Sequence, residues 1–173
     1  MNLDELKNNL SSANNPNGPF IWEEPLPNEL DKGLIDLIRD YINADNERRT
    51  FIDNSFNESH SSVFHLFSKQ MAELSVRNKN KEYILFGLIS LIIEGWKDDF
   101  RVNNSMMILL YNSAIKIGVD PNVIFKDATK LAVGSIKDKM INFLKKPDQK
   151  KALNSAMYIE SEGEHGFIYK RNW

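Results

Sequence analysis

The densest group of chemically capable side chains lies between positions 94 and 101. It contains Glu94, Trp96, Asp98, Asp99 and Arg101, so three carboxylates stand close to a guanidinium and an indole. Carboxylates held at the end of a rigid helix can serve as general acid and base, and the same groups can form a recognition patch. Ion pairs that only secure a loop use the same residue types. The sequence leaves these three roles open and identifies no catalytic residue.

Histidine spacing and the lack of cysteine bear on metal binding. The chain has 3 histidines, His60, His65 and His165, and no cysteine. His60 and His65 are five residues apart, a spacing that places them on different faces of a helix. A pair of zinc-binding histidines on a helix is instead spaced by four residues. Without cysteine, thiolate zinc sites, iron–sulfur clusters and cysteine nucleophiles are excluded. We therefore expect neither a metal nor a cofactor.

Glycines and lysines bear on nucleotide and nucleic-acid binding. The 8 glycines are scattered and form no phosphate-binding loop or nucleophile elbow. Lysines are frequent from Lys126 to Lys151 and offer contacts to phosphate groups. They are lysines 126, 130, 137, 139, 145, 146, 150 and 151. Because they lack arginines and interleaved exposed aromatics, and because the net charge is −2, nucleic-acid binding is disfavoured and stays a second alternative.

Charge is distributed unevenly along the chain. Residues 1–60 hold 12 acidic and 5 basic side chains, a net charge of −7, whereas residues 126–173 hold 6 acidic and 10 basic ones, a net charge of +4. Solvated helix faces account for such runs, but faces of opposite potential also steer charged partners. Acidic residues such as Glu23, Glu24, Asp36 and Asp40 would attract a basic protein.

Apolar residues recur at helical spacing along most of the chain. They predict helices over about 3–10, 28–43, 45–53, 63–77, 81–94, 107–117, 121–133 and 135–146. A polar link is expected over 97–103. The stretch 81–94 is apolar on nearly every side, which is typical of a central helix. Asp120 followed by Pro121 is the strongest helix start, and Gly118 closes the preceding helix.

These elements predict an all-α protein. We expect a short N-terminal helix and linker over 1–19, then one helical domain over 20–173. The domain is a multi-helix bundle or a short stack of antiparallel helical hairpins, with a small C-terminal β-hairpin over 157–170 and His165 in its turn. The longest apolar run, 83–93, is about half the ~20 residues of a membrane span. With no signal-peptide pattern, a cytoplasmic location is expected.

Part of the chain resembles a known group of proteins. The stretch 86–132 contains Leu88-Ile-Ser-Leu-Ile-Ile-Glu94, Asp99-Phe-Arg-Val-Asn103 and Gly118-Val-Asp-Pro121. It is similar to small uncharacterised bacterial all-helical proteins, some of which are immunity-protein-like, as in toxin systems. The resemblance implies a protein that binds another protein, without naming the partner or the contact residues.

The leading hypothesis is therefore a non-catalytic protein–protein interaction module. It would bind and occlude a partner, a basic toxin or a regulatory target, as immunity or regulatory proteins do. The first alternative is a small enzyme that uses Glu94, Asp98, Asp99 and Arg101. The oligomeric state and the identity of the partner stay open.

Overall fold

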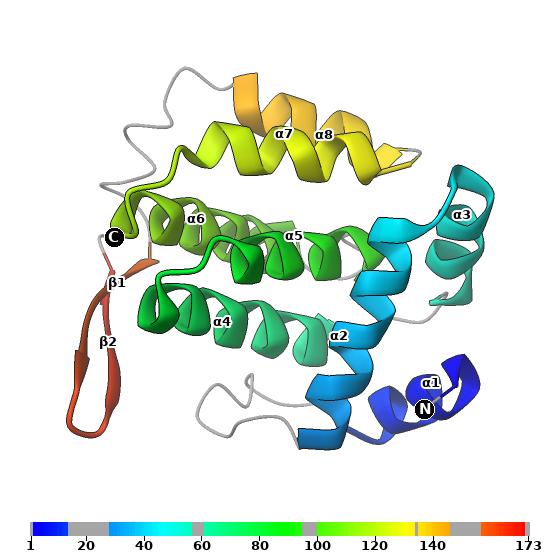
Figure 1. The fold of residues 1–173 in the computed structure, drawn as a ribbon, viewed down its shortest axis with the longest axis horizontal. Coiled ribbons are helices and arrows are strands. Elements are labelled where there is room, and N and C mark those ends of the chain that lie inside the picture. Colours follow the sequence, from blue (N-terminus) through cyan, green and yellow to red (C-terminus); the bar gives the residue numbers. More distant parts are fainter. Residues whose placement is uncertain are drawn as a thin grey trace.

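The computed structural model describes residues 2–13, 28–56, 61–94, 100–133, 135–145 and 157–171, and it shows a helical bundle with a C-terminal β-hairpin (Figure 1). The predicted fold class is confirmed. The helices and strands of these ranges are α1 (Leu3–Ala13), α2 (Asn28–Asn43), α3 (Asn46–Ser55), α4 (Ser61–Asn78), α5 (Glu82–Glu94), α6 (Phe100–Lys116), α7 (Pro121–Leu131), α8 (Ser135–Lys145), β1 (Met157–Gly163) and β2 (Gly166–Arg171).

The helices form a stack that is crossed at one end by α2 (Figure 1). α4, α5, α6 and α7 lie above one another with similar axis directions, and α2 runs across them. α1 and α3 lie beyond α2, whereas the hairpin lies at the opposite end of the stack. The molecule therefore has two distinct ends, one built from α1–α3 and the other from β1–β2. No helix in the described ranges is both long and apolar enough to cross a bilayer.

The core is centred on α5, as its sequence predicts. Almost every residue from Ile84 to Glu94 is buried, because α5 contacts α2, α3, α4, α6 and α7. Gly87 lets α6 approach closely, since a Cβ atom at this position would lie 2.7 Å from Cδ2 of Leu110. On the α4 side, the hydroxyls of Ser68 and Ser90 are 2.9 Å apart and hydrogen-bonded. Small residues thus set the contact distance of three central helices.

Helix boundaries follow local signals in most places. Asp120 is the N-cap of α7 and accepts a hydrogen bond from the backbone N–H of Asn122, with Pro121 at the first helical position. Gly118, after α6, has a φ of +77°, a conformation that glycine adopts without strain. Both expectations are confirmed.

The start of α6 differs from the sequence-based expectation. The predicted link over 97–103 is wrong for residues 100–103, because α6 begins at Phe100. Polar residues such as Asn103 suggested a loop, but their cost inside a helix is only a few tenths of a kcal/mol relative to other residues. A polar run is therefore a weak helix breaker when glycine and proline are absent from it.

The β-hairpin packs on α4 and α6. β1 and β2 are antiparallel, and an irregularity between Ile159 and Ser161 makes Glu160 an extra residue in β1. The Nζ of Lys116 in α6 donates a 2.7 Å hydrogen bond to the carbonyl of Glu160, and Ile159 is buried in the core. A two-stranded hairpin is marginal on its own, so these contacts with the helices are what stabilise it.

Candidate protein-binding groove

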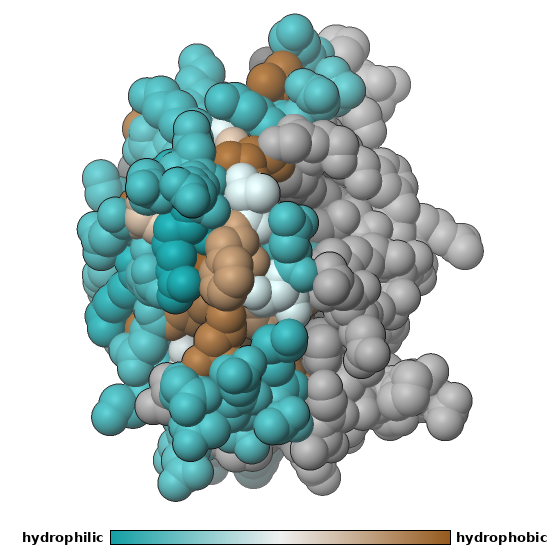
Figure 2. Space-filling view, turned by 90° about the vertical axis from the view of Figure 1, so that its right-hand side faces the viewer, coloured by the Kyte–Doolittle hydropathy of each residue, from teal (hydrophilic) through white to brown (hydrophobic). Residues whose placement is uncertain are grey.

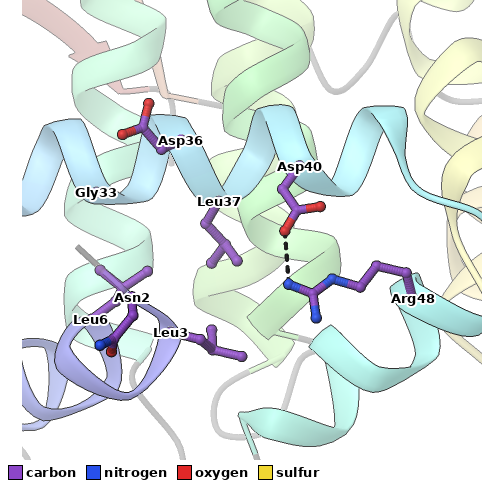
Figure 3. A pocket seen from close by; sticks show the side chains of 8 residues that line it. All are labelled: Asn2, Leu3, Leu6, Gly33, Asp36, Leu37, Asp40 and Arg48. Atoms are coloured by element: carbon purple, nitrogen blue, oxygen red, sulfur yellow. Dashed lines mark hydrogen bonds and ion pairs between the residues drawn. The ribbon is translucent and has the colours of Figure 1, made fainter.

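The end of the molecule formed by α1, α2 and α3 contains a groove of about 390 Å³. Its lining residues are drawn in Figure 3 and are Asn2, Leu3, Leu6, Gly33, Asp36, Leu37, Asp40 and Arg48. Three separate helices contribute to it. We call this feature the α1–α3 groove.

The floor of the α1–α3 groove is apolar. Leu3 and Leu6 are three residues apart on α1, so they share one face of that helix, and Leu37 points toward them from α2 (Figure 3). Gly33 lies one turn before Leu37 and adds no side chain. Leu6 and Leu37 are buried in the hydrophobic core and Leu3 is partly buried against it, so the floor of the groove is the margin of that core.

Charged side chains form the rim. Asp36 and Asp40 are four residues apart on α2, one turn of the helix, and Figure 3 shows the Asp40 carboxylate turned toward Arg48 and that of Asp36 turned to the opposite edge of the helix. Asp40 forms an ion pair with Arg48 of α3, with 2.9 Å between Oδ2 and Nη2 and both side chains 44% exposed (Figure 3). Asp36 makes no hydrogen bond or ion pair with any part of the chain that the structure describes, and its carboxylate turns toward solvent. The rim therefore has one paired and one available carboxylate.

A partly buried polar corner holds α3 against α2. The guanidinium of Arg49 donates hydrogen bonds to the carbonyls of Tyr41 (2.9 Å) and Ile42 (3.0 Å), which cap the end of α2. The hydroxyl of Tyr41 lies 3.3 Å from Oδ2 of Asp53. Burial raises the pKa of Tyr41, and the neighbouring Asp53 carboxylate raises it further, so this hydroxyl stays a donor. The corner fixes the angle between the helices at which Arg48 reaches Asp40.

Apolar surface continues beyond the groove. Figure 2 faces the side of the molecule that carries α1–α3, and it shows a strip of hydrophobic side chains between hydrophilic ones. Phe51 of α3 is 53% exposed, and the guanidinium carbon of Arg48 lies 5.2 Å from the centre of its ring. Exposed apolar side chains bordered by charges are typical of surfaces that bind other proteins.

The structure describes only part of the cluster at 94–101. Glu94 is the last residue of α5 and its side chain is buried, with 1% exposed. Trp96, Asp98 and Asp99 lie outside the described residues, and of Arg101 only its place in α6 is described. His65 is buried in α4, and His60 lies outside the described residues. In the described ranges, no group of three or more histidine, aspartate or glutamate side chains is placed to hold a metal ion.

Charges predicted to steer partners are found at both ends of the chain. Asp36 and Asp40 lie in the groove rim, whereas Glu23 and Glu24 lie outside the described residues. In the basic stretch, the structure describes the side chains of four lysines of α7 and α8, and all four are exposed. They are Lys126, Lys130, Lys137 and Lys145. Lys130 lies 3.9 Å from Asp127, so acidic side chains interrupt this surface.

Sequence reasoning missed the leucine floor and Arg48. Leu3, Leu6 and Leu37 looked like ordinary core positions, and only the docking of α1 beside α2 shows that they border an opening. The sequence gives one indication of where Arg48 lies, because Asp45 is a typical helix-capping residue. In the structure Asp45 caps α3 by accepting a hydrogen bond from the backbone N–H of Arg48, so Arg48 lies in the first turn of this helix. Comparison of the chain with protein-family models, curated proteins and solved structures found no match, so the groove is interpreted from its geometry alone.

Proposed function

We propose that this protein is a non-catalytic interaction module that binds a partner protein through the α1–α3 groove. The observation that carries the proposal is the combination of a leucine floor with a carboxylate rim in one opening. Apolar contact supplies affinity, while exposed carboxylates steer a basic surface toward the groove. Its volume of about 390 Å³ is enough to receive side chains that project from a partner.

Charge supports a basic partner. The described residues of α1–α3 and their links, 2–13 and 28–56, hold 9 acidic and 5 basic side chains, a net charge of −4. This exceeds the −2 of the whole chain, so negative potential is concentrated at the groove end. A basic protein therefore approaches this end faster than the lysine-rich α7–α8 surface.

The finer proposal is an immunity or regulatory role. A bound partner would have its own functional surface covered by α1–α3, which is inhibition by occlusion. The resemblance of residues 86–132 to immunity-protein-like bacterial proteins supports this role, as does the acidic groove that a basic toxin or regulatory target would complement. The proposal places this module in the cytoplasm.

A charge reversal at the rim tests the proposal. Asp36 is exposed and makes no polar contact with the described residues, so we expect Asp36→Lys to leave the fold intact. We expect the wild-type protein to retain a stoichiometric partner from native lysate and Asp36→Lys to lose it about tenfold or more, because a like charge now faces the partner. The matched control is Glu164→Lys, which makes the same charge change in the exposed hairpin turn.

Two results would contradict the proposed function. One is the absence of any stoichiometric partner for the wild-type protein. The other is equal retention by wild type and Asp36→Lys, which would place the binding surface elsewhere. Circular dichroism and thermal melts of both variants show whether the fold is unchanged.

A further inference from the structure

Arg48 already occupies the acidic rim of the α1–α3 groove. Asp36 and Asp40 lie one turn apart on α2 and both line the groove, and like charges at this spacing repel. Arg48 compensates only Asp40, to which it is bonded at 2.9 Å. The rim thus has one site for a cation that is filled from within the chain, and a second site at Asp36 that the described residues leave unfilled.

The contact between Arg48 and Asp40 is easily exchanged. Both side chains are 44% exposed, and exposed ion pairs contribute little net stability because water and salt screen them. Arg48 also has a second contact, since its guanidinium carbon lies 5.2 Å from the ring centre of Phe51. The guanidinium can therefore release Asp40 and still rest on an aromatic ring of its own helix.

The walls of the groove favour a helix as the occupant. They are built from α1, α2 and α3, whose backbone groups are bonded within the helices, so an extended strand would find no main-chain partners there. A helix satisfies its own backbone and brings apolar and charged side chains along one face. Two cations at positions i and i+4 of such a helix match the spacing of Asp36 and Asp40.

We infer that the groove takes an amphipathic helix of another protein that carries two cations four residues apart, one of which displaces Arg48 from Asp40. An apolar side chain of the same helix enters between Leu3, Leu6 and Leu37. This inference rests on the proposed function and adds the chemistry of the partner. Arg48 acts as an internal competitor, so apolar surface alone or a single cation binds weakly and selectivity for the two-cation pattern rises.

Peptide binding tests the inference directly. The probe is an alanine-based helical peptide of about 18 residues, long enough to be partly helical in water, with two arginines four residues apart next to leucines on the same face. A matched peptide has glutamates in place of the arginines. Binding is measured by titration at about 50 mM salt and again at about 300 mM, because screening weakens exposed charge contacts. The wild-type chain is expected to bind the arginine peptide and not the glutamate peptide, and more weakly at high salt.

Variants of Arg48 and Asp40 test whether Arg48 competes with the peptide for Asp40. Arg48→Met keeps the aliphatic stem and removes the charge, so we expect the arginine peptide to bind about threefold to tenfold more tightly. Asp40→Asn removes the contested carboxylate and should weaken binding by a similar factor. In the double variant, the gain from Arg48→Met should vanish, because there is no longer an acceptor over which to compete.

Failure of this inference is separable from failure of the proposed function. If Arg48→Met weakens binding, or strengthens it equally with and without Asp40, Arg48 is a structural or contacting residue and the competition is refuted. If neither peptide binds the wild-type chain, the basic-helix partner is refuted. The proposed function is judged by a different result, the loss of the native partner from Asp36→Lys.

Discussion

The hydroxyl of Tyr169 in β2 donates a hydrogen bond to the carboxylate of Glu73 in α4, and Lys69 binds both residues. The Nζ of Lys69 lies 3.4 Å from Oε1 of Glu73 and 5.3 Å from the centre of the Tyr169 ring. A second group repeats the arrangement toward the hairpin turn, where Arg77 pairs with Glu162 at 2.9 Å and lies 4.9 Å from the ring centre of Phe167. Two cations of α4 therefore each hold one aromatic ring of β2.

Removal of the Tyr169 hydroxyl should loosen the hairpin. We expect Tyr169→Phe to lower the free energy of unfolding by about 1.5–3 kcal/mol, the range for a hydrogen bond to a charged group. Amide hydrogen exchange should accelerate in β1 and β2 before it changes in α5. Ile168→Ala is the control, because Ile168 is on the outer side of β2 and 49% exposed. Equal exchange in Tyr169→Phe and wild type would contradict this role.

The same hydrogen bond makes stability depend on alkaline pH. Burial raises the pKa of Tyr169 above its usual value of 10, and the Glu73 carboxylate raises it further. A pKa raised on folding means that the contribution of Tyr169 is complete below pH 10 and is lost as the pH rises above 10. Denaturant unfolding at pH 8 to 11 should show a steeper loss for wild type than for Tyr169→Phe. Parallel curves would exclude this origin.

Asp31 is expected to make the stability of the fold depend on pH in the acidic range. Its Oδ2 accepts a 3.0 Å hydrogen bond from Gln70, but its Oδ1 is buried without a hydrogen-bond partner among the described residues. Burial raises the pKa of Asp31 above 3.8, more than the Gln70 contact lowers it. Ionised Asp31 therefore destabilises the fold at neutral pH, and this penalty disappears as the pH falls below the folded-state pKa. We expect Asp31→Asn to be more stable than wild type at pH 7, with the difference shrinking toward pH 4. A pH-independent difference would count against burial as the cause.

At Gly87 the usual helix-stabilising effect of alanine is predicted to be offset by a clash. Alanine favours helices by about 1 kcal/mol over glycine, but its Cβ would stand 2.7 Å from Cδ2 of Leu110. Overpacking of this kind costs about 1–3 kcal/mol, so we expect Gly87→Ala to be neutral to destabilised by about 2 kcal/mol. In a Leu110→Ala background the clash is absent, and the same change should stabilise. Additive effects in this double-mutant cycle would refute the contact.

The side-chain amide of Asn112 is buried in the helical core. It lies in α6 with 5% of its surface exposed, and within the part of the chain that the structure describes its Oδ1 and Nδ2 have no hydrogen-bond partner. Burial of unpaired polar groups costs about 1–3 kcal/mol, so Asn112→Leu should raise the free energy of unfolding by an amount in this range. Asn142→Leu, in an exposed position of α8, is the control and should change stability by less than about 0.5 kcal/mol. A destabilised Asn112→Leu would indicate that the amide binds water.

Local signals account for what the sequence predicted well. The cap at Asp120, the turn at Gly118 and the all-round apolar character of α5 each depend on neighbours within a few positions, so they are visible without coordinates. The C-terminal hairpin is also local, because its strands are joined by a short turn.

The groove depends on geometry that no local pattern encodes. Arg48 meets Asp40 only because Arg49 fixes the angle between α2 and α3. Leu3 and Leu37 line one groove only because α1 docks on α2. Tyr169 and Glu73 are 96 positions apart, so their pairing depends on the packing of the whole bundle. The carboxylates, the arginine and the indole of 94–101 made that stretch the predicted site. The groove is built mostly from residue types that are common in any protein core or surface, so its sequence does not mark it as a site.

The extra residue in β1 determines which face of the hairpin the side chains after position 160 occupy. Side chains alternate between two faces, so the bulge at Glu160 turns Glu162 to the same side as Ile159, where it meets Arg77. Lys116 contacts position 160 through the main-chain carbonyl, which every amino acid supplies. Deletion of position 160 would leave Ser161 as the single residue between Ile159 and Glu162, so Glu162 would keep its side in a regular ladder, whereas insertion of one more residue there would turn it to the opposite side.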